Sequence, residues 1–122
     1  MNKKVLIVDD EPGIVRLLSM RLKSKNYEVF EAYDGLDCIA IAEKELPDLI
    51  LMDIKMPNGG GFGAFEKLSQ IESTKNIPVI FMTAYPKAEI KTQVESLGAK
   101  GLISKPFISE DFEQTIETVI GL

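Results

Sequence analysis

Short runs of consecutive apolar residues alternate along the chain with segments whose apolar residues recur at helical spacing. The clearest runs lie at 5–8 (Val-Leu-Ile-Val), 49–52 (Leu-Ile-Leu-Met) and 78–82 (Pro-Val-Ile-Phe-Met). Runs of this length are typical of strands that are buried on both faces, as in parallel sheets. Weaker strand patterns occupy 27–33 and 102–103. The sequence therefore predicts five strands.

Five helices are expected between and after these strands. Pro12 suits the first turn of the first helix, because the backbone N–H that proline lacks would have no partner within the helix at that position. The remaining helices are predicted at about 36–46 before Pro47, at 62–71, at 86–97 before Gly98, and from a cap at Ser109 through Ile120. Parallel strands joined by helical crossovers give a three-layer α/β sandwich, and we expect residues 1–122 to form one such domain.

Composition excludes several classes of function. The 122 residues carry a net charge of −5, which disfavours direct nucleic-acid binding by this domain. The single cysteine, Cys38, excludes an internal disulfide and favours a reducing, cytoplasmic location. The apolar run at 5–8 is too short for a signal peptide or a membrane span. With no histidine in the chain, any chemistry must use carboxylates, hydroxyls and lysines.

Polar residues follow four of the five predicted strands at their carboxyl ends. Asp9 and Asp10 follow the first strand, Asp53 the third, Thr83 the fourth and Lys105 the fifth. Ligands of open parallel sheets bind beside such ends, where the strand order reverses. Periodicity alone does not fix that order. We infer the flavodoxin-like order 2-1-3-4-5 because it makes the four polar strand ends neighbours and leaves the second strand at an edge.

This set of side chains suits phosphoryl transfer. Three carboxylates in one crevice repel one another, and a Mg²⁺ ion would resolve that repulsion. A lysine and a threonine hydroxyl could contact phosphate, while an aspartate can accept a phosphoryl group covalently. Each residue also has an ordinary structural interpretation, such as helix capping for Asp9 and Asp10. Chance would have to place compatible groups at all four strand ends, so the joint pattern favours a site.

Four stretches of the chain resemble the receiver domains of two-component response regulators. They are Val-Asp-Asp-Glu at 8–11, Leu-Met-Asp-Ile-Lys-Met-Pro at 51–57, Met-Thr-Ala at 82–84, and Gly-Ala at 98–99 leading to Lys-Pro-Phe at 105–107. Each stretch is weak evidence alone, but their order and spacing together are highly specific. The resemblance covers essentially the whole chain, from Lys4 to the last helix.

The resemblance implies a role for each acidic residue. Asp53 would accept the phosphoryl group. Mg²⁺ would be bound directly by Asp10, Asp53 and the main-chain carbonyl of Lys55, while Asp9 would act on it largely through water. The domain would then be a phosphoacceptor switch that catalyses only its own phosphorylation and dephosphorylation, rather than an enzyme.

The resemblance also implies contacts and partners. Lys105 and the Thr83 hydroxyl would contact the phosphoryl oxygens, and the Lys105–Pro106 bond is expected to be cis. The phosphoryl donor would be a sensor histidine kinase or a phosphotransfer protein, and the output a downstream effector domain or protein. We expect no membrane contact, and either a monomer or a phosphorylation-dependent dimer.

Two positions depart from the family pattern. Leu102 stands where the family usually has a tyrosine or phenylalanine that moves on activation, and Gly59-Gly60-Gly61 replaces a hydrophobic-acid-glycine run. One alternative is therefore a phosphorylation-independent protein-interaction module that keeps the pocket but not the switch. Another is a small enzyme with a nucleotide-binding loop at 59–63, which lacks both the dinucleotide spacing and the lysine of a P-loop.

Overall fold

The computed structural model describes residues 2–57, 59–105 and 110–121, within which strands and helices alternate. The strands are β1 (Lys4–Val8), β2 (Glu28–Ala32), β3 (Leu49–Asp53), β4 (Val79–Thr83) and β5 (Gly101–Ser104). The helices are α1 (Pro12–Ser24), α2 (Gly35–Glu45), α3 (Gly60–Ser69), α4 (Ala88–Leu97) and α5 (Glu110–Ile120). The described helices include none that is long and apolar enough to cross a membrane.

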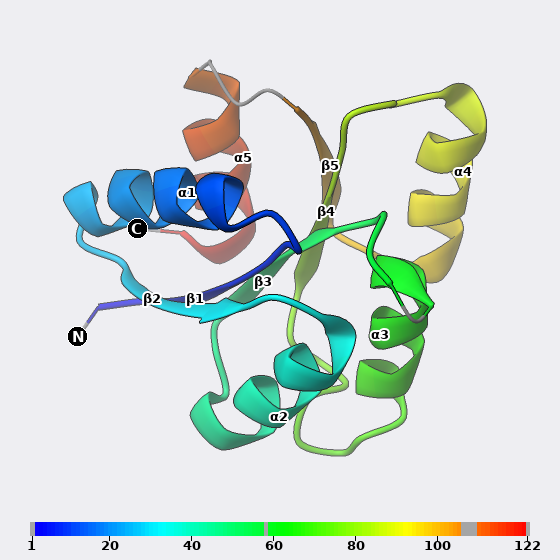
Figure 1. Cartoon of the computed structure of the whole chain (residues 1–122), viewed down its shortest axis with the longest axis horizontal. Helices are drawn as coiled ribbons and strands as arrows, with labels where there is room; N and C mark the ends of the chain where they lie inside the picture. Colours follow the sequence, from blue (N-terminus) through cyan, green and yellow to red (C-terminus); the bar gives the residue numbers. More distant parts are fainter. Residues whose placement is uncertain (1, 58, 106–109, 122) are drawn as a thin grey trace.

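All strand pairs are parallel, and the sheet has the order β2-β1-β3-β4-β5. This order confirms the prediction made from the polar strand ends. Strand β3 lies at the centre, between β1 and β4, and its last residue Asp53 pairs with Met82. The carboxyl ends of β1, β3, β4 and β5 therefore meet along one edge of the sheet, as Figure 1 shows.

Two apolar cores lie on opposite faces of the sheet, as expected for three layers. Alternate residues of each central strand face opposite sides, so Val5 and Ile7 enter one core while Leu6 and Val8 enter the other. Helices α1 and α5 cover the first face, and α2, α3 and α4 cover the second (Figure 1). Every residue of β3 and β4 is buried, which explains why their sequences are nearly continuous apolar runs.

Helix α3 begins earlier than the sequence predicts. It starts at Gly60 rather than near Phe62, although glycine is a poor helix former. Its N-cap, Gly59, has a φ of 96°, a left-handed conformation that favours glycine. The N–H of Gly61 donates to the carbonyl of Ile54 (2.9 Å), which draws this first turn against the end of β3.

Helix α4 begins at Ala88, two residues after the predicted start at Pro86. A turn precedes it, in which the N–H of Lys87 donates to the carbonyl of Tyr85 (2.8 Å). The predicted cap at Ser109 and the predicted cis bond before Pro106 lie outside the described residues.

Candidate functional site

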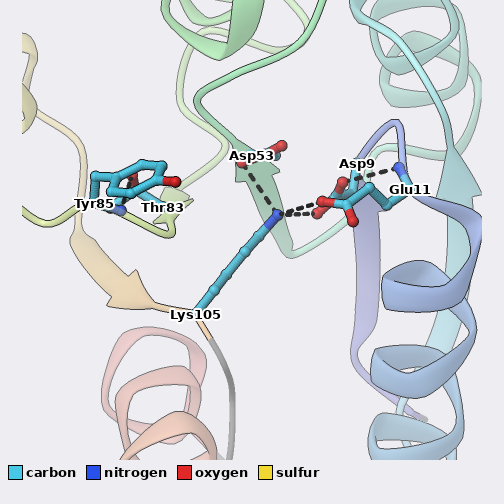
Figure 2. Close-up of polar contacts among 6 residues, drawn as sticks. All are labelled: Asp9, Glu11, Asp53, Thr83, Tyr85 and Lys105. Atoms are coloured by element: carbon cyan, nitrogen blue, oxygen red, sulfur yellow. Dashed lines mark hydrogen bonds and ion pairs between the residues drawn. The ribbon is translucent and has the colours of Figure 1, made fainter.

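The site lies at the edge of the sheet where four strands end (Figure 2). Asp9 and Asp10 follow β1 directly, Asp53 ends β3, Thr83 ends β4, and Lys105 follows β5. The strand order thus brings together all five of the side chains that the sequence singles out. A hollow of about 380 Å³ opens here and is lined by residues from each of these strand ends and from the loop after Thr83.

Three carboxylates converge at the centre of the site. Asp9, Asp10 and Asp53 each offer an oxygen, and these three oxygens lie within 4.8 Å of one another. Asp9 is fully buried and Asp53 is 5% exposed, whereas Asp10 faces solvent. Carboxylate oxygens at such distances, with one side open to water, are the ligands that hard divalent cations prefer. The donor set therefore fits Mg²⁺.

Lys105 is the cationic side chain of the site and reaches across the sheet edge to the acids (Figure 2). Its Nζ donates to Asp9 Oδ2 at 2.7 Å and lies 3.4 Å from Asp53 Oδ1. Its main-chain N–H donates to the carbonyl of Thr83 at 2.8 Å, which fixes the base of the side chain beside β4. The ammonium is therefore shared between two of the three clustered carboxylates.

Glu11 is a member of this network that the sequence analysis missed. One of its carboxylate oxygens lies 3.6 Å from Lys105 Nζ, and its N–H donates to Asp9 Oδ1 at 3.0 Å. The side chain is 65% exposed, so this ion pair is weak compared with the buried Lys105–Asp9 pair. Its position directly after Asp9 and Asp10 in the sequence could have indicated that Glu11 belongs to the site.

The electrostatics of the site disfavour a full set of ionised carboxylates. Burial, together with the nearby charge of Asp9, raises the pKa of Asp53 from 3.8 to about 6, although Lys105 opposes this rise. Burial also raises the pKa of Asp9, against the hydrogen bonds from Lys105 and Glu11. Burial of the Lys105 ammonium lowers its pKa, but the hydrogen bond and charge of Asp9, with the charge of Asp53, raise it overall. The cluster therefore retains uncompensated negative charge that a bound cation would neutralise.

Thr83 and Tyr85 form the opposite side of the hollow. The Thr83 hydroxyl accepts a hydrogen bond from the N–H of Tyr85 (3.1 Å), so its own proton remains available to a ligand oxygen. The ammonium of Lys55 lies 4.7 Å from the centre of the Tyr85 ring, a cation–π contact between two residues that line the hollow. The direct binding of Mg²⁺ by the Lys55 carbonyl stays a prediction.

The backbone around Asp53 is held from behind by the start of α3. A Cβ atom on Gly61 would lie 2.3 Å from the Asp53 carbonyl oxygen, and one on Gly60 would lie 2.6 Å from that of Ile54. Both distances are too short for any side chain. These two glycines are therefore required by close backbone approach and do not form an open phosphate-binding loop.

Comparisons with known proteins identify the family of this chain. The family model of the response regulator receiver domain matches residues 5–117. The chain is 36% identical to sporulation initiation phosphotransferase F of Bacillus subtilis over 122 residues, which are 100% of the chain and 97% of that protein. It is also 36% identical to the DNA-binding regulator RpaA of Synechocystis over 119 residues, but these span only 48% of that longer protein.

Solved structures show the same fold. The chemotaxis protein CheY4 of Vibrio cholerae superposes with a TM-score of 0.91 and 33% identity, with 98% of this chain and 99% of that one covered. The family match covers most of the chain, including the carboxyl ends of all five strands. The chain belongs to the response regulator receiver domain family of two-component systems.

Proposed function

We propose that this receiver domain accepts a phosphoryl group on Asp53 in a Mg²⁺-dependent reaction and thereby changes its affinity for a protein partner. The donor is a phosphohistidine on a sensor kinase or a phosphotransfer protein in the cytoplasm. The recipient of the signal is an effector domain or protein, and residues 1–122 act as one receiver unit. Membership of the family and the convergence of three strand-end carboxylates support this proposal.

In the transfer step, a carboxylate oxygen of Asp53 attacks the phosphorus of the phosphohistidine. A P–O bond forms as the P–N bond breaks, and the released imidazole nitrogen takes up a proton. Lys105 can bind an oxygen of the phosphoryl group as that group is transferred, because its Nζ already lies 3.4 Å from Asp53 Oδ1. The Thr83 hydroxyl donates to another of these oxygens. Both contacts offset negative charge that accumulates during transfer.

Asp10 and Asp53 would hold the metal directly, with the Lys55 carbonyl, and Asp9 would hold its water ligands. Bound there, Mg²⁺ would neutralise the negative charge of the carboxylates and of the incoming phosphoryl oxygens.

Asp10 is the most informative residue to replace in a test of the metal site, because it is exposed and its replacement leaves the buried core intact. We expect Asp10→Asn to weaken Mg²⁺ affinity in calorimetric titrations. Unchanged affinity would remove Asp10 from the metal site.

The proposal rests on the position of Asp53 at the centre of the acidic cluster. Mass spectrometry after treatment with phosphoramidate or acetyl phosphate and Mg²⁺ should show one added phosphoryl group. That group should be absent from Asp53→Asn and present in the control Asp37→Asn, whose carboxylate is exposed on α2 away from the cluster. A phosphoryl group that persists in Asp53→Asn would show that another residue is the acceptor.

The alternative, an interaction module that needs no phosphorylation, draws support from Leu102. This residue lies half-buried against the core beneath α4 and has no ring to move. Beryllofluoride, a mimic of the phosphoryl group, separates the two functions. Its Mg²⁺-dependent binding to the wild type would favour the acceptor, whereas absent binding together with absent phosphorylation would favour the interaction module.

A further inference from the structure

A second hollow is lined by residues at the start of α2 and along α3. Figure 1 shows these two helices on the face of the sheet opposite α1 and α5. The volume of the hollow is about 340 Å³, within the range of pockets that take small ligands or single side chains. We call it the α2–α3 hollow. Its lining includes Asp34, Gly35, Leu36, Gly59, Gly63 and Lys67.

Gly63 leaves this hollow open although nothing around it requires a glycine. It lies within α3 with an ordinary helical backbone, and a Cβ atom there would meet no heavy atom within 4 Å. Gly35 differs, because its Cβ atom would touch the Cβ of Ala64 at 3.4 Å, where the two helices approach closely. Glycine is unfavourable inside a helix. Neither the backbone conformation nor a close neighbour therefore requires glycine at position 63, and a larger side chain there can extend into the open space beside the hollow.

Leu36 provides an apolar group of suitable shape at the rim of the same hollow. It is the second residue of α2 and is 68% exposed, the largest exposed fraction among the described large apolar side chains. A protruding leucine beside an empty apolar hollow makes the surface complementary to itself. Asp34 and Lys67, of opposite charge, also line the hollow, so two copies can place unlike charges together. Such a surface suits a two-fold interface, in which each contact occurs twice.

We propose that the α2–α3 hollow is a self-association site that binds a second copy of this chain. In the two-fold pair, the Leu36 side chain of each copy fills the hollow of the other, and Lys67 of each faces Asp34 of the other. The net charge of −5 on each copy opposes association, so the dimer is weak and is strengthened by salt. This proposal does not depend on phosphorylation of Asp53.

Sedimentation velocity on the full chain without phosphodonor, over a wide concentration range, tests the proposal. We expect the wild type to dimerise and both Leu36→Ser and Gly63→Leu to weaken dimerisation by about tenfold or more, because each removes a leucine's burial twice. A Cβ atom at position 63 would meet no heavy atom within 4 Å, and leucine favours a helix more than glycine does, so Gly63→Leu should melt at or above the wild-type temperature. A melting curve of this variant therefore separates lost dimerisation from unfolding.

Mixing the two variants gives a sharper test. Leu36→Ser keeps the hollow and Gly63→Leu keeps the leucine, so the mixture preserves one of the two contacts and should associate more tightly than either variant alone. Met20→Ser is the matched control, since Met20 is 66% exposed on α1 and should not affect dimerisation. The proposal fails if the wild type stays monomeric, if both variants dimerise normally, or if Met20→Ser weakens the dimer as much as Leu36→Ser.

Discussion

Replacing Asp53 with asparagine should make the metal-free protein more stable at neutral pH, although it removes the acceptor. The Asp53 side chain is 7% exposed and lies beside the buried Asp9. Asparagine has nearly the same shape as the protonated acid and carries no charge. The variant therefore relieves the cost of holding a second carboxylate in the cluster, while Lys105 keeps its hydrogen bond to Asp9.

The magnitude follows from the pKa of Asp53. Folding raises this pKa from 3.8 to about 6, and each unit corresponds to roughly 1.4 kcal/mol. Ionised Asp53 therefore destabilises the metal-free fold by roughly 1–3 kcal/mol at pH 7. Because the folded-state pKa is the higher one, this cost is absent below pH 3.8, develops as the pH rises toward about 6, and is complete above it.

Urea unfolding in the presence of a chelator, followed by circular dichroism from pH 4 to pH 8, measures this difference. We expect Asp53→Asn and the wild type to have similar free energies of unfolding near pH 4 and to diverge above pH 6. Saturating Mg²⁺ should narrow the difference or reverse it, since the ion stabilises only a protein that can bind it.

Glu66→Gln serves as the control, because Glu66 is exposed on α3 and away from the acidic cluster. Its free energy of unfolding should follow that of the wild type at every pH. A constant difference between Asp53→Asn and the wild type across the pH range would refute the reasoning, as would a less stable variant at pH 7 without metal. The first result would mean that the Lys105 ion pair balances burial and repulsion, and the second that it outweighs them.

Three further predictions concern other parts of the chain. Tyr85 lines the same hollow as Asp53, where we expect its ring to hinder an attacking water; Tyr85→Ala should therefore speed loss of the phosphoryl group several-fold in a phosphate-release assay, and equal rates would exclude this role. Cys38 is fully buried, and burial with the charge of Asp34 raises its pKa to about 12; iodoacetamide should label it only on unfolding, and rapid native labelling would contradict this. Beryllofluoride should shift the amide resonances near Gly61 and Tyr85 more than those near Leu102. Larger shifts near Leu102 would mean that Leu102 transmits the conformational change.

The central strands could be predicted from sequence because burial on both faces leaves continuous apolar runs. The order of the strands in the sheet was inferred from the polar residues at their carboxyl ends, since periodicity does not indicate which strands are neighbours. The order 2-1-3-4-5 was inferred because it places Asp53, Thr83 and Lys105 on neighbouring strands, and the structure has this order. The site could thus be located from four strand ends without knowledge of a single distance.

Other features depend on distances between side chains that a sequence does not contain. The contact between Lys55 and Tyr85 joins two loops that are adjacent only after β3 and β4 pair. The first turn of α3 lies before the helix predicted at 62–71, because the helix propensity of glycine does not reveal the hydrogen bond from the Gly61 N–H to the Ile54 carbonyl. The ion pair of Glu11 with Lys105 likewise appears only when β5 is placed.

The attachment of Lys105 has a consequence for the speed of the first response. Its main chain is bonded to Thr83 while its ammonium has three carboxylates within 3.6 Å, so a rotation of methylene groups suffices to change its partner. This rotation needs no movement of the main chain, whereas loops and helices rearrange over nanoseconds to milliseconds. The Lys105 ammonium can therefore change its carboxylate partner before the backbone moves. The electric field in the pocket would then respond to an arriving anion earlier than the conformation of the domain does.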